Sequence, residues 1–550
     1  MTNVKRASFV FCFFLAVSCF LTVRLYDLAM YDNTSKQVLS GQYTRSRTAA
    51  QRTGFVYDTN GKLLSHRQQG AAAIVNPSGT WDKNAAAQFL GRYSEIPLDE
   101  ILTKISKPEP FIIALTHLPD EKAPDSVYVY PLFEQSENGL CRHILGYRNI
   151  SGVGMDGIYG KFDGILDRIS GRVDFSYISD AAGGMLTGEG FTVTDRGYTD
   201  MSGIVLTIDS QIQQSVDEVC GKYMDMGAVI VCNVTTGEML AVSSRPLYDR
   251  EDVAESLESD RGELINRAFS LYTPGSVFKT AVAAAVLEID ESLYDFEYEC
   301  TGECDVSGKT FRCHNLSGHG MQTMKQAFAN SCNTYFINLV EQTGFEYVLN
   351  KIKQMGMGNG NAVDGIFVKG AVLPEEGVSY PPAYKANFSF GQGDILTSPV
   401  DIMRLFCVCT TGFERSFSLV KGLYDSGEDK MTYFSIGSQE RKLSDSTVEK
   451  MREMMQECVT SGTGKAAYVK GVQAGGKTAT AQSGQYKNGT EVLHRWFAGV
   501  FPIDEPEYAV VVLCDGNGEK NGNPVKIFAE ITKAISGSHG QNIKNAAIVQ

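Results

Sequence analysis

The sequence predicts an α+β fold with one N-terminal transmembrane helix, and three observations lead to this prediction. An uncharged apolar run lies near the N-terminus, short strand-like runs continue to about residue 202, and longer apolar strands then stand at both ends of a largely helical region. Strands separated by helices imply one sheet assembled from distant parts of the chain. The 550 residues allow two to four domains with a sizeable core.

The composition excludes several classes of protein. Apolar residues make up 43% of the chain and charged residues 21%, which predicts neither long disorder nor many membrane helices. The net charge of −14 would repel a phosphate backbone, so we expect no nucleic-acid partner. The 13 cysteines are irregularly spaced and predict no complete disulfide framework.

The N-terminal apolar run predicts a membrane anchor. Residues 7–23 are just long enough to cross the hydrocarbon core as a helix, and the two cations before them favour keeping residues 1–6 in the cytoplasm. A cleaved signal peptide is the alternative, because residues 16–18 resemble a cleavage site and Cys19 resembles a lipidation cysteine. Since the apolar run continues beyond that site, we favour an uncleaved single-pass anchor in the cell membrane, with the remaining chain extracytoplasmic.

The rest of the chain is expected to form two folded parts. Residues 31–51 are too polar for a core element and predict a stalk, whereas strand-like runs at 54–58 and 71–75 predict a β-rich domain. The predicted order is a cytoplasmic tail (1–6), a transmembrane anchor (7–23), a stalk (24–51), a β-rich domain (52–202), an α+β domain (203–536) and a flexible tail (537–550).

The elements of the α+β domain are predicted from periodicity. Residues 209–219 predict an amphipathic helix capped by Asp209, and the run 280–287, which is apolar on every side, predicts a helix buried at the domain centre. Apolar runs predict strands at 204–208, 227–234, 238–243, 494–501 and 507–514.

The first of three candidate motifs is Ser276 with Lys279. Pro274 and Gly275 make a tight entry into the predicted buried helix, so Ser276 stands at its start and Lys279 lies one turn further on the same face. A serine becomes nucleophilic when a base takes its proton, and a desolvated lysine is neutral enough to do so. The pair predicts an activated serine; a helix-capping serine with a solvated lysine is the alternative.

The second motif is Ser331 and Asn333, separated by one residue at a polar corner between two predicted helices. The first helix opens with a capping box at 323–326, and the second covers 334–342 and stops at Gly344. A serine here is able to relay a proton, and an asparagine amide both donates to and accepts from a peptide bond. An ordinary turn between helices is the alternative.

The third motif is Lys477–Thr480, on a strand edge suited to an extended peptide. Lys477 would attract a carboxylate and Thr478 would hydrogen-bond it. Residues 471–478 also match the phosphate-binding loop pattern G-x-x-x-x-G-K-[ST]. We reject the nucleotide interpretation because that loop must open a helix, whereas residues 479–489 lack a helical stripe.

Together the three motifs resemble the signature of penicillin-recognising serine enzymes. Over nearly its whole length the chain is similar to class B penicillin-binding proteins, the cell-wall transpeptidases of division, elongation or sporulation. The resemblance implies a transpeptidase domain, with a central antiparallel sheet flanked by helices, on a β-rich pedestal of the dimerisation type. Further similar runs are 52–61, 152–159, 236–241, 266–268, 391–393, 397–399 and 496–499.

The same resemblance implies a mechanism. Ser276 would be the acylated nucleophile and Lys279 its base, while Ser331 and Asn333 would assist proton transfer and hold the donor stem peptide. The enzyme would be a peptidoglycan D,D-transpeptidase, which replaces the terminal D-Ala of one stem by an amine of a neighbouring stem.

In this family Lys477 and Thr478 would bind the terminal carboxylate of the donor, and the backbone N–H groups of Ser276 and Thr480 would form the oxyanion hole. One residue departs from the family pattern, which has glycine after Lys-Thr where this chain has Ala479. A methyl group there is expected to crowd the strand against the nucleophile, leaving the enzyme active but altering its acylation by β-lactams.

The implied ligands and partners are D-Ala-D-Ala stem peptides, β-lactams, the cytoplasmic membrane, a polytopic glycosyltransferase and other cell-wall proteins, with no metal or cofactor. A β-lactam sensor or a catalytically weak scaffold of the cell-wall machinery is the alternative function. A β-lactamase or D,D-carboxypeptidase would transfer the acyl group to water, and the anchor and pedestal argue against both.

Three cysteines beside a histidine, Cys300, Cys304, Cys313 and His314, suggest a zinc site. Their spacing is not that of a standard zinc finger, and an exported domain meets an oxidising compartment. We therefore favour a disulfide, with Cys300–Cys313 as the predicted pair.

Overall fold

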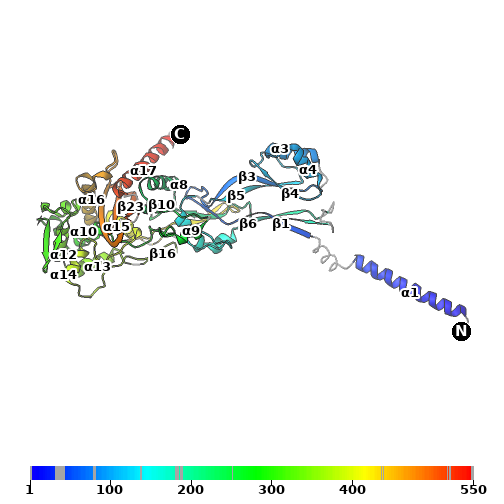
Figure 1. The fold of residues 1–550 in the computed structure, drawn as a ribbon, viewed down its shortest axis with the longest axis horizontal. Helices are drawn as coiled ribbons and strands as arrows, with labels where there is room; N and C mark the ends of the chain where they lie inside the picture. The colour runs from blue at the N-terminus through cyan, green and yellow to red at the C-terminus, as the bar shows by residue number, and fades with distance from the viewer. Residues whose placement is uncertain are drawn as a thin grey trace. The chain divides into compact units, whose positions relative to one another are not determined.

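The structure is a computed structural model, and it describes residues 3–30, 44–78, 82–136, 139–179, 185, 190–250, 252–358, 360–434, 437, 439–487, 489–516, 518 and 522–546. It divides into two compact units (Figure 1). The smaller unit contains Met1–Thr53, Arg67–Glu134 and Ile169–Asp200, and the larger contains Gly54–His66, Gln135–Arg168 and Met201–Gln550.

This division differs from the single boundary predicted near residue 202. Two segments expected in the β-rich domain, Gly54–His66 and Gln135–Arg168, belong to the larger unit. The reason for the first is strand pairing, because β2 (Phe55–Tyr57) lies parallel to β8 (Gly203–Leu206) in a four-stranded sheet. Local sequence does not reveal such long-range pairing.

The smaller unit begins with a long apolar helix and contains two sheets. In α1 (Asn3–Met30), residues Ala7–Asp27 are long and apolar enough to cross a membrane, at the position predicted for the anchor. The sheets have the orders β1-β6-β7 and β4-β3-β5. The elements of this unit after α1 are β1 (Thr44–Arg52), β3 (His66–Val75), α3 (Lys83–Tyr93), α4 (Leu98–Ser106), β4 (Phe111–Leu115), β5 (Val127–Gln135), β6 (Gly171–Ile178) and β7 (Thr192–Arg196).

The prediction of a stalk over 24–51 is wrong at both of its ends. Helix α1 continues to Met30, and the strand β1 begins at Thr44 and pairs antiparallel with β6; residues 31–43 lie outside the described part of the chain. Most side chains of β1 are exposed, so the strand is joined to its sheet mainly through backbone hydrogen bonds. Because such a strand needs no apolar stripe, its polar sequence conceals it.

The larger unit is built on a five-stranded antiparallel sheet of order β10-β9-β23-β22-β21. Its strands come from the two ends of the domain, as predicted, and β21 lies at an edge. They are β9 (Gly227–Asn233), β10 (Met239–Arg245), β21 (Gly475–Lys487), β22 (Thr490–Phe501) and β23 (Tyr508–Asp515).

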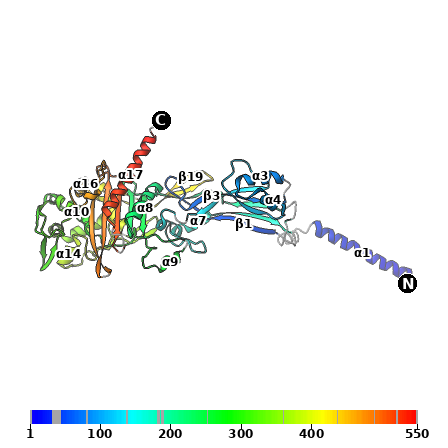
Figure 2. The same ribbon diagram turned by 45° about the horizontal axis from the view of Figure 1, so that its top comes forward.

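Helices cover both faces of this sheet (Figures 1 and 2). On one face, α8 (Ser210–Tyr223) and α17 (Pro524–Ala546) bury a cluster that includes Phe497 and Phe528. On the other lie α15 (Pro399–Thr411) and α16 (Asp445–Thr460), which both contact the central helix α10 (Lys279–Ile289). As predicted, α10 is buried all round, from its first residue to Leu287.

Helix α17 extends through part of the flexible tail predicted over 537–550, since it runs to Ala546; residues 547–550 lie outside the described part of the chain. Ile527, Phe528 and Ile531 pack into the core of the sheet at the beginning of α17. Once those turns are formed, each further residue adds a hydrogen bond at little cost, so the helix propagates beyond its buried part.

The remaining elements of the larger unit are short and connect the layers. They are α5 (Arg142–Leu145), α6 (Gly157–Lys161), α7 (Asp163–Arg168), α9 (Val253–Glu258), η1 (Gly275–Phe278), η2 (Glu291–Asp295), β11 (Tyr298–Cys300), β12 (Glu303–Val306), β13 (Lys309–Arg312), β14 (Gly320–Gln322), α11 (Met324–Ala329), α12 (Asn333–Thr343), α13 (Phe345–Gln354), β15 (Asn361–Val363), β16 (Ile366–Val368), α14 (Pro382–Phe388), β17 (Phe413–Arg415), β18 (Val420–Asp425), β19 (Lys430–Tyr433), β20 (Gln439–Arg441) and η3 (Lys465–Ala467).

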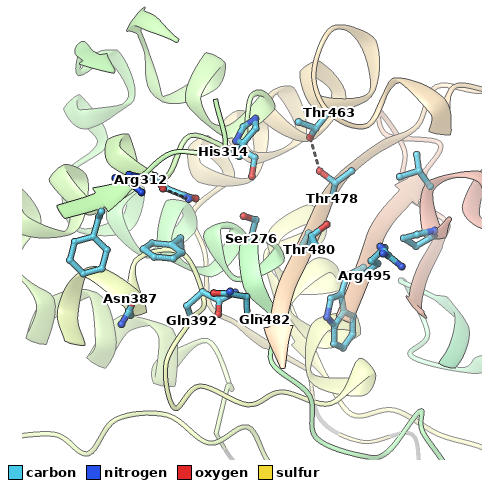
Figure 3. A pocket seen from close by; sticks show the side chains of 18 of the residues that line it. Ser276, Arg312, His314, Asn387, Gln392, Thr463, Thr478, Thr480, Gln482 and Arg495 are labelled. Atoms are coloured by element: carbon cyan, nitrogen blue, oxygen red, sulfur yellow. Dashed lines mark hydrogen bonds between the residues drawn. The ribbon is translucent and has the colours of Figure 1, made fainter. Parts of the chain in front are cut away.

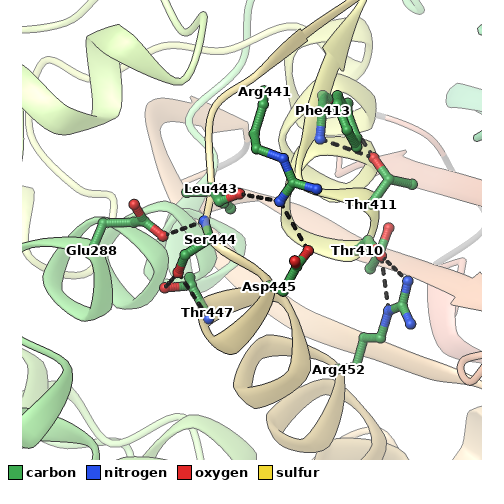
Figure 4. A network of polar contacts seen from close by, with 10 residues as sticks. All are labelled: Glu288, Thr410, Thr411, Phe413, Arg441, Leu443, Ser444, Asp445, Thr447 and Arg452. Atoms are coloured by element: carbon green, nitrogen blue, oxygen red, sulfur yellow. Dashed lines mark hydrogen bonds and ion pairs between the residues drawn. The ribbon is translucent and has the colours of Figure 1, made fainter.

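A polar network joins the end of α10 to the start of α16 (Figure 4). The Glu288 carboxylate accepts from the Ser444 backbone N–H at 2.7 Å, and the Ser444 hydroxyl in turn caps α16 by accepting from Thr447 N–H. Lys351 pairs with Glu288 at 3.4 Å. Burial alone would raise the pKa of Glu288, but the hydrogen bonds from Ser444 and Thr447 and the Lys351 charge outweigh it, so this pKa is lowered.

This network predicts a pH-dependent loss of stability in Glu288→Gln. Because the folded pKa is lowered, the contribution of ionised Glu288 is complete above its usual value of about 4.3 and is lost as the pH falls through the folded value. We expect the substitution to lower the free energy of unfolding by about 2 kcal/mol at neutral pH and by less at acidic pH. Denaturant unfolding of the detergent-solubilised chain at both pH values measures this. Glu449→Gln, at an exposed position on α16, is the control, and an equal loss at both pH values would contradict the prediction.

Candidate active site

The three sequence motifs meet at one cleft of about 1440 Å³ in the larger unit (Figure 3). Six of the eight predicted site residues line it: Ser276, Ser331, Asn333, Thr478, Ala479 and Thr480. The two lysines, Lys279 and Lys477, are fully buried instead and lie beneath its surface. Residues as far apart in the chain as Ser276 and Thr480 therefore form one site.

Ser276 lies in a 3-10 turn rather than in the first turn of an α-helix. This turn, η1, leads directly into α10, and the Lys279 backbone N–H donates to the carbonyl of Ser276. Two contacts hold the entry to η1, since Gly275 N–H donates to Gly391 O at 2.9 Å and the Trp496 indole donates to Thr273 O at 3.1 Å. The serine is thus half-buried at the N-terminal end of a buried helix, where the helix dipole favours negative charge.

Glycine is required at two positions beside the serine. Gly391 has φ +74°, and a Cβ atom there would lie 2.1 Å from the carbonyl oxygen of Gly275. Gly275 itself has φ +56°, and its Cβ would lie 2.9 Å from that of Ala481 on β21. The absence of side chains at both positions allows the serine turn to approach the edge strand closely.

The Lys279 amine is held by the second motif. Its Nζ donates to the Ser331 carbonyl at 2.7 Å and to the Asn333 Oδ1 at 2.8 Å, and it lies 3.4 Å from the Ser331 hydroxyl. Burial, followed by the charge of Lys477, holds the pKa of Lys279 well below its usual value. A neutral amine that donates to two oxygens retains a lone pair, so it is able to accept a proton.

The corner that carries Ser331 has an uncommon backbone. Ser331 adopts φ +56° between α11 and α12, and its N–H donates to Phe328 O at 3.1 Å. A left-handed conformation at a residue other than glycine costs of order 1 kcal/mol and persists where the surroundings impose it. Here it directs the serine carbonyl at Lys279, while the Asn333 amide also donates to Arg312 O at 3.2 Å.

The third motif forms the opposite wall, on β21. Lys477 Nζ donates to the carbonyl of Thr478 at 3.1 Å, and its burial lowers the pKa of this lysine. The hydroxyls of Thr478 and Thr463 lie 2.6 Å apart at the surface of the cleft (Figure 3). Ala479 is only 7% exposed, whereas Thr480 is exposed to the cleft.

Comparison with known proteins identifies the family. The model of the penicillin binding protein transpeptidase domain matches residues 227–536, more than half of the chain. The chain belongs to this family. Stage V sporulation protein D of Bacillus subtilis is 28% identical over 547 residues, covering 94% of this chain and 82% of that protein. The peptidoglycan D,D-transpeptidase MrdA of Acinetobacter baumannii is 23% identical over 544 residues, covering 86% of this chain and 79% of that protein.

Solved structures agree on the fold. A chain described under structural coordination of polymerization and crosslinking by a peptidoglycan synthase complex aligns with a TM-score of 0.67 and 22% identity, covering 97% of this chain and 98% of that one. Penicillin-binding protein 3 of Mycobacterium tuberculosis, complexed with aztreonam, aligns with a TM-score of 0.63 and 20% identity, covering 91% and 98%. The predicted class B penicillin-binding protein with an α+β transpeptidase domain is confirmed.

Several residues of this penicillin-binding protein face the cleft without having been predicted. Thr463 lies in the run Ser461–Gly464, which reads only as a turn in the sequence. Gln392 lies in the run 391–393, where the resemblance to the family gave the only signal. The others come from strands, from helix α14 and from a loop, with no chemical motif of their own. They are Arg312, His314, Asn387, Gln482 and Arg495 (Figure 3).

The structure contradicts the predicted disulfide between Cys300 and Cys313, since both are free thiols. The two sulfurs lie 3.6 and 3.5 Å from the same atom, His319 Nδ1. Cys313 Sγ also lies 3.9 Å from Cys332 Sγ, which is beyond the 2.05 Å of a disulfide bond. Cys300 and Cys313 therefore share His319 as a neighbour, and Cys313 also contacts His314 and Cys332.

The close approach at Gly391 predicts a large effect of one methyl group. In Gly391→Ala the new Cβ must displace the turn that carries Ser276, so we expect a loss of about 3 kcal/mol or more in the free energy of unfolding. Gly393→Ala is the matched control: it also has positive φ, at +84°, but its Cβ would meet only the Asn387 Cβ at 3.6 Å. Its loss should be about 1 kcal/mol. Denaturant unfolding compares the two, and equal losses would mean that the contact with Gly275 does not matter.

Proposed function

We propose that this penicillin-binding protein crosslinks peptidoglycan stem peptides through an acyl-enzyme on Ser276. The observation that supports this most directly is the buried Lys279, whose amine contacts only neutral oxygens of Ser331 and Asn333 among its hydrogen-bond partners. Burying an amine without a compensating carboxylate costs free energy. The position of the buried Lys279 amine close in sequence to Ser276, which lines the cleft, favours a catalytic role for this lysine over a structural one.

The proposed reaction consists of two acyl transfers. Ser276 Oγ attacks the carbonyl carbon of the penultimate D-Ala while neutral Lys279 accepts the hydroxyl proton. The bond to the terminal D-Ala then breaks, and its amine leaves with a proton delivered through Ser331. An amine of a neighbouring stem attacks the ester, loses a proton to the same relay and releases the serine hydroxyl. One peptide bond is broken and one is formed.

The terminal carboxylate of the donor would bind at the hydroxyls of Thr478 and Thr463. They lie close enough to donate to the same carboxylate, and both line the cleft. Lys477 contacts the carbonyl of Thr478 from beneath the strand. We therefore assign Lys477 the task of positioning Thr478 and adding positive potential, rather than direct contact with the carboxylate.

The oxyanion hole would use the backbone N–H groups of Ser276 and Thr480. A Cβ built on Gly275 lies 3.3 Å from Thr480 O, so this carbonyl faces the serine turn rather than β22. In a strand, the N–H and C=O of one residue point to the same side, which directs the Thr480 N–H to the cleft as well. Because β21 is an edge strand, a donor peptide would also be able to pair with it as an added strand.

The proposed setting is the outer face of the cytoplasmic membrane. The apolar segment Ala7–Asp27 would anchor the protein, with the transpeptidase domain extracytoplasmic. We propose a polytopic glycosyltransferase and other cell-wall proteins as partners, on the basis of the fold shared with a chain of a peptidoglycan synthase complex. β-Lactams are proposed as ligands, because a protein of the same fold is known with aztreonam.

Covalent labelling tests the acyl-enzyme. The full-length chain in detergent, treated with a fluorescent penicillin, should gain one long-lived adduct by intact mass, while Ser276→Ala gains none and Lys279→Ala reacts at least about 100-fold more slowly. Ser270→Ala, six positions earlier in the chain, is the control and should label normally. A folded wild-type chain that gains no adduct, and that does not react with a stem-peptide thioester either, would contradict the acyl-enzyme proposal.

A crosslinking assay separates the transpeptidase from the sensor or scaffold. The acylated chain should transfer its acyl group from a stem-peptide donor to an added acceptor amine faster than to water. A β-lactam sensor would form the adduct without crosslinking, and a hydrolase would release it to water.

The alanine at position 479 predicts a specific rate effect. Ala479→Gly removes the methyl group that is expected to crowd the acylating ligand, so the rate constant of penicillin acylation should change, with an increase of about tenfold expected. Stopped-flow fluorescence of the labelled chain measures it. Ala481→Gly, two positions further along β21, is the control for the added backbone freedom. If the two glycine variants acylate alike, the methyl group at 479 has no role in reactivity.

A further inference from the structure

The short segment that leads to Ser276 rests on one face of the five-stranded sheet. The Trp496 indole on β22 donates to the Thr273 carbonyl at 3.1 Å. A Cβ atom built on Gly275 would lie 2.9 Å from that of Ala481 on β21. Because both contacts lie within three residues of the serine, a change in this face of the sheet would move the turn that carries the nucleophile.

His494 on β22 is part of the same face. It stands directly opposite Ala481 in the pairing of β22 with β21. Its ring meets the Tyr272 ring edge-on, with the ring centroids 5.0 Å apart and the planes at 87°. Trp496 contacts the same tyrosine at 6.3 Å. Since alternate residues of a strand face the same side, His494 and Trp496 support Tyr272 together.

The histidine is buried beside an ion pair. It is only 6% exposed, and its partner in register on β23 is Asp515. The Asp515 carboxylate lies 3.8 Å from the Arg267 Nε, and both of these side chains are less than a tenth exposed. In the part of the chain that the structure describes, the His494 Nδ1 has no hydrogen-bond partner. A buried nitrogen without a partner costs free energy, so packing alone would favour an apolar ring here.

The surroundings of His494 keep its ring neutral. Burial lowers the pKa of His494, although the charge of Asp515 opposes this effect. Burial raises the pKa of Tyr272, whose hydroxyl therefore stays protonated. At neutral pH an uncharged imidazole meets Tyr272, and only acid would add a third charge beside Asp515 and Arg267.

We propose that neutral His494 supports Tyr272 and thereby positions the nucleophile turn for acylation of Ser276. Among the described residues, neither His494 nor Tyr272 belongs to the lining of the cleft, so His494 is a positioning residue that acts through its neighbour. Its effect on acylation rests on the proposed acyl-enzyme function. The support of the segment before Ser276 rests on the ring contact alone.

Acylation rates test this support. In the full-length chain in detergent, His494→Ala should slow acylation by a fluorescent penicillin by about tenfold or more, because the turn is no longer held in place. The dissociation constant of the unreacted penicillin should not change. His494→Phe keeps an uncharged ring of similar shape and should acylate within about threefold of wild type at neutral pH.

His66→Ala is the matched control. His66 is 5% exposed, and its ring meets the Phe55 ring edge-on at 5.1 Å, so the substitution removes a similar buried contact in the same unit. This variant should acylate at the wild-type rate. Equal acylation rates in His494→Ala and His66→Ala would overturn the proposal.

A double-mutant cycle tests whether His494 acts through Tyr272. Tyr272→Ala should also slow acylation, and His494→Ala/Tyr272→Ala should be no slower than the slower single variant, because each change removes the same contact. Rate losses that multiply would mean that His494 acts independently of Tyr272, which contradicts the proposal.

The pH profile of acylation tests the requirement for a neutral ring. The pKa of His494 is lowered from its usual value of 6.5, so the ring gains a proton only below that pH. Titration of Lys279 affects the wild type and His494→Phe alike. The ratio of the variant rate to the wild-type rate should therefore rise at least about twofold as acid protonates His494. A ratio that is constant over the whole range in which both chains stay folded would refute the requirement.

Hydrogen exchange separates this proposal from failure of the acyl-enzyme function. The backbone N–H groups of Tyr272 and Gly275 each donate to a backbone carbonyl at 2.9 Å. Their exchange should be at least about tenfold faster in His494→Ala than in wild type or His66→Ala. If exchange responds in this way but no chain is acylated, the acyl-enzyme function fails and the support of the segment before Ser276 stands. Unchanged exchange in His494→Ala would overturn that support.

Discussion

The proposed active site depends on the burial of one lysine, Lys279. Desolvation favours the neutral amine of Lys279, but a buried amine must also have partners for its N–H groups. Those partners are the Ser331 carbonyl and the Asn333 side chain. The backbone conformation of the corner between α11 and α12 therefore helps to set the basicity of Lys279, the proposed base. A change that relaxes this corner would alter the basicity of Lys279 without touching it.

A second constraint is the close approach of the nucleophile turn to the edge strand β21. Gly391 and Gly275 leave room for it, and the Trp496 indole holds Thr273 at the entry to the turn. This arrangement leaves one edge of β21 facing the cleft, where a peptide is able to add as a further strand. Ala479 lines the cleft within this narrow space, which is why we propose that its methyl group affects acylation.

Contacts from distant segments also surround the corner between α11 and α12. Ser331 holds a left-handed backbone that local sequence does not favour, so distant contacts must impose it. Three other segments of the chain reach the residue beside it through Cys300, Cys313 and His319.

Much of the architecture could be predicted from local sequence. Side-chain periodicity and capping act within a few residues, so they can be recognised in one segment at a time. They predicted the spacing of Ser276 and Lys279, the buried run of α10, the capping box before α11 and the two strands near the C-terminus. The polar strand β1 was missed because it lacks an apolar stripe. The juxtaposition of Ser276, Ser331 and Lys477 depends on contacts between distant segments. The burial of both lysines depends on them too. Such contacts arise from packing of the whole domain, which leaves no periodic trace in the sequence of any one segment.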